Sequence, residues 1–131
     1  MSHDLAALAP EVLAFLAERH LATLTTLRPD GSPHVVPVGF SYDAEARLVR
    51  VISFAGSRKV RNLEAQPGSR VAVSQVDGGR WLTLEGTGTV TRDPERVAEA
   101  VRGYAARYRQ PGERDDRVAI EIAVDRVLGR A

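Results

Sequence analysis

The chain has 131 residues, 44% of them hydrophobic, which is enough for one compact domain with its own core. A formal net charge of +1 argues against a nucleic-acid-binding surface, and the absence of cysteine excludes disulfides, thiolate metal ligands and thiol nucleophiles. The sequence has no signal-peptide pattern and no run of about 18 apolar residues, so we expect a cytoplasmic protein without a membrane segment.

The first half of the chain predicts one helix followed by three strands. Pro10 and Glu11 suit a helix start, and the apolar stripe that follows indicates an amphipathic helix at about 10–19. Runs rich in β-forming residues then alternate with turn signals rich in Gly, Pro and Asp. These runs predict an antiparallel meander of three strands, at residues 21–27, 33–42 and 47–54.

The second half predicts two more helices and three more strands. Ser57 is a natural N-cap for a short helix at 58–65, and Asp93 with Pro94 starts another that ends near Tyr108. Gly86 and Gly88 indicate a bulge or bend in a long strand. The predicted strands cover residues 70–76, 81–91 and 118–124.

Six strands and three short helices predict a mainly β fold with helices (α+β). We expect a six-stranded antiparallel barrel flanked by the helices, in a single domain over residues 1–131 with the barrel at about 20–128. Side chains fill the interior of so small a barrel. A sizeable ligand must then bind in a surface groove or between two subunits, which favours a homodimer.

One short segment stands out for its residue types. Lys59 is the only lysine among eighteen basic residues, and Asn62 is the only asparagine. A compact ammonium beside Ser57 and Arg58, next to the N–H groups of a helix start, is typical of a phosphate site. The alternative is that these basic residues are simply solvated.

Catalytic constellations are scarce. The three histidines are His3, His20 and His34, and no metal-ligand spacing is present. No serine lies in a Gly-x-Ser-x-Gly elbow, so covalent catalysis has little support and no catalytic residue can be named. If the protein is an enzyme, a bound cofactor carries the chemistry.

Several runs resemble a known superfamily. Residues 21–40 (LATLTTLRPDGSPHVVPVGF), followed by Arg50-Val-Ile-Ser and then residues 56–63 (GSRKVRNL), are similar to the split barrels of pyridoxamine 5′-phosphate oxidases. Residues 74–86 (SQVDGGRWLTLEG), 104–109 (YAARYR) and 126–129 (RVLG) resemble the actinobacterial biliverdin reductases that use reduced coenzyme F420. The resemblance extends from about Phe15 to Gly129 and implies an FMN-binding-like split barrel.

The resemblance implies a cofactor groove at a homodimer interface. The basic segment after the third strand would hold the cofactor phosphate, and the second strand and the next hairpin would hold its ring, with Trp81 supplied by the same or by the partner subunit. The implied cofactor-binding residues are His34, Val35, Val36, Pro37, Ala55, Gly56, Ser57, Arg58, Lys59, Asn62, Gln75, Val76 and Trp81. His34 could instead be an exposed strand residue, and Trp81 a packing residue.

The implied activity is hydride transfer from reduced coenzyme F420 to a conjugated acceptor, with biliverdin as the tetrapyrrole substrate and no protein nucleophile. Candidate substrate-binding residues are Arg80, Arg107 and Arg109. Arg80 could instead be an ordinary hairpin residue, and the other two could complement a helix dipole. The alternatives are an FMN-dependent enzyme like pyridoxamine-phosphate oxidase, and a non-catalytic protein that binds F420, flavin or haem.

Overall fold

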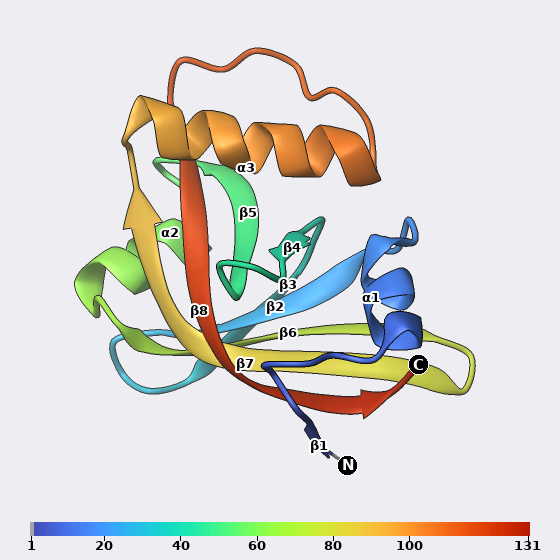
Figure 1. The fold of residues 1–131 in the computed structure, drawn as a ribbon. Helices are drawn as coiled ribbons and strands as arrows, with labels where there is room; N and C mark the ends of the chain where they lie inside the picture. Colours follow the sequence, from blue (N-terminus) through green and yellow to red (C-terminus); the bar gives the residue numbers. More distant parts are fainter. Residues whose placement is uncertain (1) are drawn as a thin grey trace.

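The computed structural model describes residues 2–131 and contains three helices and eight strands (Figure 1). The helices are α1 (Pro10–Ala17), α2 (Arg58–Ala65) and α3 (Pro94–Arg107). The strands are β1 (Ser2–His3), β2 (Ala22–Leu27), β3 (Pro33–Val38), β4 (Ser41–Asp43), β5 (Leu48–Phe54), β6 (Ser69–Asp77), β7 (Arg80–Thr91) and β8 (Arg117–Arg130).

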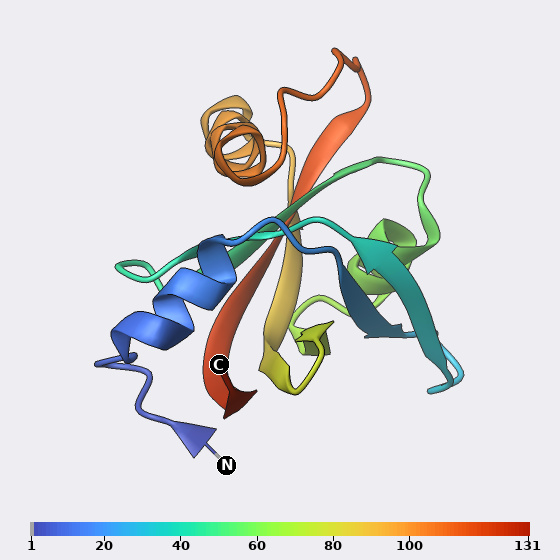
Figure 2. The ribbon, with the colours of Figure 1, turned by 90° about the vertical axis from the view of Figure 1, so that its right-hand side faces the viewer.

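All strands belong to one antiparallel sheet with the order β3-β2-β6-β7-β8-β5-β4, and β1 pairs with β8 beside this path. The long strands β7 and β8 run from beneath α3 to the opposite end of the molecule and join the two halves of the sheet (Figure 1). The three helices lie at separate places around the curved sheet (Figure 2). No helix within residues 2–131 combines the length and apolar character needed to cross a bilayer.

The mainly β, antiparallel architecture is confirmed, but the prediction of a six-stranded barrel is wrong. The sheet has eight strands, and within the described residues no pairing joins its end strands β3 and β4, so it is not closed. One extra strand is β1, whose partner in β8 is more than a hundred residues away in the sequence. The other arises because the expected strand at 33–42 is divided into β3 and β4.

The division of that strand has a physical cause in α3. At the break, the Phe40 N–H donates to the Tyr108 hydroxyl at 3.2 Å. A Cβ on Gly39 would lie 2.9 Å from the Tyr104 ring and 3.0 Å from the Tyr108 ring. Glycine therefore allows the chain to pass close beneath both rings. The sequence around residue 39 does not reveal these distant partners.

Features that depend on neighbouring residues were predicted better than those that depend on distant partners. The register between β7 and β8 shifts between Glu85 and Gly86, so the predicted bulge is confirmed. Glycine is needed there because a Cβ on Gly86 would lie 2.0 Å from the Ala123 carbonyl oxygen. The predicted N-caps are also confirmed, since Ser57 and Asp93 each accept a backbone N–H of their own helix's first turn. The core is formed by alternate residues of the strands together with the apolar face of α1.

Candidate functional site

A pocket of ≈ 320 Å³ lies between β3, β5, α2, the C-terminal part of α3 and the loop that precedes β8. This volume is within the range of small-molecule sites. The loop before β8 and the turn between β5 and α2 both lie to the right of α3 in Figure 2. The lining residues are Pro37, Val38, Gly39, Ile52, Ser53, Phe54, Lys59, Tyr104, Arg109, Pro111, Gly112, Arg114 and Arg117.

Lys59 supplies a cation to this pocket from the first turn of α2. The side chain is partly buried, with Nζ 6.0 Å from the centroid of the Phe54 ring, and burial lowers the pKa of the amine. Within residues 2–131, Lys59 forms no salt bridge. A partly desolvated ammonium without a carboxylate partner gains by binding an anion.

His34 lies close to the same group of cations. Burial is the main cause that lowers the pKa of its imidazole, and the charges of Arg28, Arg58 and Lys59 lower it further. The ring is therefore neutral at pH 7. Its Nδ1 atom is buried and has no hydrogen-bond partner in the described part of the chain, and His34 is not among the residues that line the pocket.

The Ser57 hydroxyl is engaged within the protein. It accepts the Val60 N–H at 3.4 Å and lies 2.9 Å from the Ser53 hydroxyl. Asn62 is also buried, and its Nδ2 donates to the Thr26 hydroxyl at 3.0 Å, which links α2 to β2. Neither side chain lines the pocket, unlike Lys59.

Arg107 and Gln75 lie in the interior and hold α3 against the rest of the fold. The Arg107 guanidinium donates to the Glu18 carbonyl at 2.7 Å, the Phe40 carbonyl at 2.9 Å and Gln75 Oε1 at 2.6 Å. Gln75 in turn donates to the Phe15 carbonyl at 3.0 Å. These buried side chains satisfy backbone groups that would otherwise have no partner, and the structure does not bring them to the pocket.

The remaining predicted residues lie in four kinds of position. Pro37 and Arg109 line the pocket with Lys59, while Val36 and Ala55 pack against the core. The residues that are largely exposed are Val35, Gly56, Arg58 and Val76. Trp81 is partly buried and pairs with Val76 at the β6–β7 hairpin, among residues that do not line the pocket.

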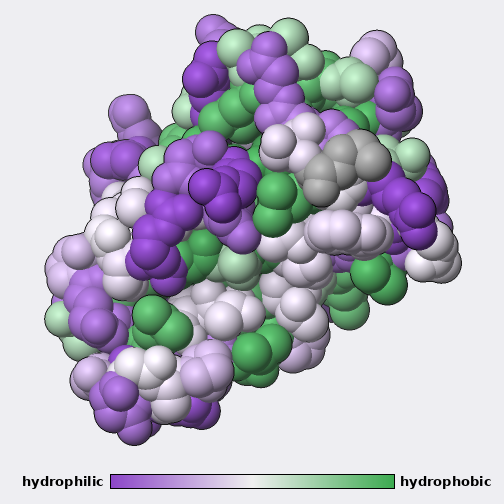
Figure 3. All heavy atoms as spheres, turned by 90° about the horizontal axis from the view of Figure 1, so that it is seen from below, coloured by the Kyte–Doolittle hydropathy of each residue, from purple (hydrophilic) through white to green (hydrophobic). Residues whose placement is uncertain are grey.

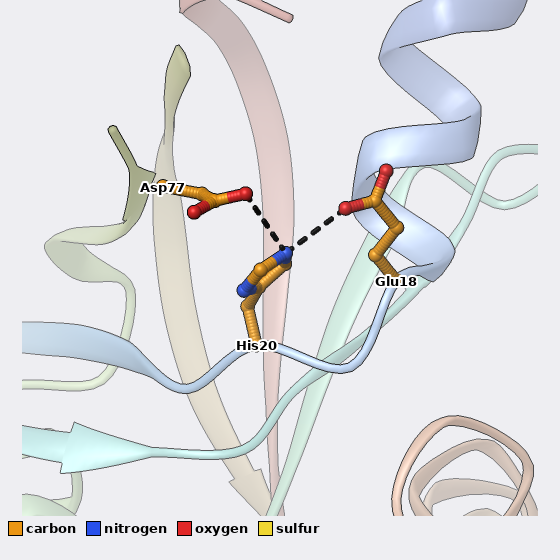
Figure 4. Close-up of side chains that lie close together, drawn as sticks. All are labelled: Glu18, His20 and Asp77. Atoms are coloured by element: carbon orange, nitrogen blue, oxygen red, sulfur yellow. Dashed lines mark hydrogen bonds and ion pairs between the residues drawn. The ribbon is translucent and has the colours of Figure 1, made fainter. Parts of the chain in front are cut away.

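Arg80 belongs to a partly exposed charged cluster with Glu18, His20 and Asp77, and Figure 4 shows these last three side chains. His20 Nε2 lies 3.0 Å from a Glu18 oxygen and 3.8 Å from an Asp77 oxygen, and Arg80 forms a bidentate pair with Glu18 at 2.9 and 3.0 Å. The cluster joins the end of α1 to the β6–β7 hairpin. Because Arg80 already donates hydrogen bonds to both carboxylates, the cluster is better suited to holding this hairpin than to binding a ligand.

This cluster predicts a pH-dependent contribution to stability. The hydrogen bond from Arg80 is the largest cause that lowers the pKa of Glu18 from 4.5 to about 2, and the one from His20 is next. A folded-state pKa below the unfolded value stabilises the protein above the unfolded pKa, and this stabilisation is lost as the pH falls through the folded pKa. We expect Glu18→Gln to lower the urea midpoint at about pH 6 but not at about pH 2.

The control for this prediction is Glu45→Gln, since Glu45 is exposed and forms no ion pair in residues 2–131. Its urea midpoint should follow the wild type at both pH values. A Glu18→Gln deficit of the same size at both pH values would show that the carboxylate charge contributes nothing.

Ten of the thirteen lining residues were not predicted from the sequence, and the aromatic or charged ones among these are Phe54, Tyr104, Arg114 and Arg117. Phe54 ends β5 directly opposite Arg117, which begins β8. Its position just before the Gly-Ser turn is the signal that could have identified it. The two arginines have no such signal, because only the pairing of β5 with β8 brings them beside Phe54.

Comparison with known proteins shows the family of this chain. The model of the pyridoxamine 5′-phosphate oxidase family matches residues 8–131. The chain belongs to this family. The predicted resemblance is thereby confirmed, and the match covers every element that contributes to the pocket.

Two of the proteins that are similar to this chain have F420 in their names. An F420H(2)-dependent biliverdin reductase of Mycobacterium tuberculosis (strain CDC 1551 / Oshkosh) is 51% identical over 124 residues, which cover 95% of this chain and 89% of that protein. A solved structure described as an F420 reductase has a TM-score of 0.71 and 27% identity, and the match covers 88% of this chain and 94% of that one.

A third comparison supports the fold alone. The crystal structure of a conserved hypothetical protein from Mycobacterium tuberculosis has a TM-score of 0.79 at 22% identity, over 99% of this chain and 89% of the other. The two chains thus share a fold at low sequence identity.

Proposed function

We propose that this protein is an oxidoreductase that uses reduced coenzyme F420 to reduce a conjugated tetrapyrrole, with biliverdin converted to bilirubin. The observation that carries the proposal is the 51% identity, over 95% of this chain, to an F420H(2)-dependent biliverdin reductase. The same proposal places the enzyme in the cytoplasm as a single split-barrel domain.

The residues of the pocket fit such a cofactor. Lys59 is a partly desolvated cation without a salt-bridge partner in the described chain, which suits a phosphate. Pro37, Ile52 and Phe54 offer apolar surface to a planar ring. When bound in its reduced form, F420 supplies a hydride to the substrate.

The chain's own residues then bind and orient rather than react. Lys59 and the neighbouring Arg58 would hold the cofactor phosphate, and the β3 backbone at His34–Pro37 would lie along the ring. Three arginines were predicted to bind the substrate, and of these only Arg109 lines the pocket. We therefore retain Arg109 as the residue that binds the carboxylates of the substrate. Holding two reactants at a fixed distance accounts for much of the catalysis in such a site.

We further propose that the active form is a homodimer. Val35 on the end strand β3 is 55% exposed, and Leu21 and Val76 are both 67% exposed at the same end of the neighbouring strands β2 and β6. The face of the molecule seen from below carries separate apolar patches among polar groups (Figure 3). A second subunit would bury such surface and would bring its Trp81 hairpin toward the cofactor.

The test is a titration of the purified protein with F420 and with FMN, followed by an assay of F420H2 oxidation with and without biliverdin. We expect F420 binding, and loss of the F420H2 signal only when biliverdin is present. Tight FMN binding without a response to F420 would contradict the proposal and favour a flavin enzyme. Binding of F420 without turnover would favour a carrier protein.

A further inference from the structure

One wall of the pocket is an aromatic ring held in place by its surroundings. The Tyr104 ring packs against the Tyr108 ring, with centroids 4.9 Å apart, and against the backbone of Gly39. Tyr108 is itself fixed, because its hydroxyl donates to the His20 carbonyl at 2.6 Å and accepts the Phe40 N–H at 3.2 Å. Tyr104 therefore presents a rigid aromatic surface to the pocket.

Two cations beside this wall are not neutralised. Arg109 and Arg117 line the pocket, and neither forms a salt bridge in the part of the chain that the structure describes. Their neighbour Arg114 differs, because it pairs with Asp116 at 2.8 Å and lies 4.5 Å above the Phe54 ring. Arg114 is thus held by the protein, while the guanidinium groups of Arg109 and Arg117 are available to a ligand.

These two cations are supplied by a different part of the fold from Lys59. Lys59 belongs to α2, whereas Arg109 follows α3 and Arg117 begins β8. A pocket with an aromatic wall and cations from separate elements suits two molecules that each carry an anionic group.

We propose that Tyr104, Arg109 and Arg117 form the acceptor subsite: Tyr104 stacks on the conjugated acceptor, and the two arginines bind its carboxylates. This inference rests on the proposed function and adds the residues that determine which acceptor is used. The acceptor that this subsite fits is a planar, conjugated molecule with two carboxylates. The part of Tyr104 that the protein holds in place is its ring, packed against Tyr108 and Gly39, so we assign this role to the ring.

The test measures binding to the F420-free protein by absorbance titration with biliverdin and with its dimethyl ester, in which both carboxylates are neutral. The double variant Arg109→Gln/Arg117→Gln should bind biliverdin about 10- to 100-fold more weakly. Its affinity for the ester should equal that of the wild type. Tyr104→Leu should weaken both ligands equally, by about 3- to 10-fold, while Tyr104→Phe should bind as the wild type does.

Affinity for F420 is the second readout, because the acidic tail of the cofactor also carries carboxylates. We expect the double variant to bind F420 as tightly as the wild type does, and Arg61→Gln, an exposed arginine outside the pocket lining, to match the wild type for every ligand. Weaker F420 binding with unchanged biliverdin binding would overturn the inference and assign the arginines to the cofactor tail.

Failure of the inference is distinguishable from failure of the proposed function. Suppose that the wild type binds both ligands and oxidises F420H2, but that the double variant prefers biliverdin over its ester as strongly as the wild type does. The acceptor subsite is then wrong and the function stands. If the wild type binds neither ligand, both are wrong.

Discussion

Replacing Lys59 with alanine is expected to weaken the binding of coenzyme F420 by about 10- to 100-fold, the effect of losing one or two hydrogen bonds to a charged group. The ammonium is partly buried in the pocket, and burial lowers its pKa, so its charge is poorly solvated in the free protein. Without ligand, its removal should therefore leave the melting temperature unchanged or slightly higher. The increase in melting temperature on adding F420 should become smaller.

Fluorescence or absorbance titration with F420 measures the first effect, and thermal unfolding with and without F420 measures the second. Arg61→Ala is the matched control, because Arg61 is exposed on the same helix and does not line the pocket. Equal losses of affinity in the two variants would mean that general positive charge, and not a specific contact of Lys59, attracts the cofactor. An unchanged affinity for Lys59→Ala would remove Lys59 from the proposed site.

The sequence was informative where local chemistry decides the structure. α2 spans the predicted residues 58–65 directly after its N-cap Ser57, and α3 begins directly after Asp93. The bulge at Gly86 follows from the same kind of local signal. Such features depend on the φ angles, hydrogen bonds and steric needs of neighbouring residues, so a short window of sequence contains their cause.

Features that depend on distant partners could not be predicted. The interruption between β3 and β4 depends on Tyr104 and Tyr108, more than sixty residues further along the chain. The addition of β1 depends on its pairing with the end of β8. Hydrophobic alternation predicts that a strand exists, but it does not show which edge a short strand joins.

The predicted site residues also divide into those that local chemistry identifies and those whose role depends on distant partners. Lys59 was singled out by residue type and local context, and it lines the pocket. Gln75 and Arg107 were assigned by resemblance to ligand contacts, yet their polar atoms bond to each other and to backbone groups inside the protein. Sequence alone does not distinguish a polar residue that binds a ligand from one that satisfies buried carbonyl groups, because both are polar residues beside apolar segments.

Replacing Arg107 with alanine is expected to lower the free energy of unfolding by about 3–5 kcal/mol, because three acceptors, two of them in buried hydrogen bonds, lose their donor at once. These acceptors are the carbonyl oxygens of Glu18 and Phe40 and the side-chain oxygen of Gln75. The guanidinium also lies 4.5 Å from the centroid of the Phe40 ring, and this packing would be lost as well. For a chain of this length, the melting temperature should fall by about 10–20 °C.

Urea unfolding and calorimetry of Arg107→Ala and Arg107→Met measure this effect, and the second variant keeps most of the side-chain volume. Because both variants leave the acceptors without a donor, Arg107→Met should recover only the packing part of the loss. Arg102→Ala is the control on the same helix: its side chain is 67% exposed and pairs with Glu99, so the change should be within about 0.5 kcal/mol. A loss equally small for Arg107→Ala would mean that the guanidinium is not needed to hold α3 on the sheet. Recovery of full stability by methionine would assign its role to packing alone.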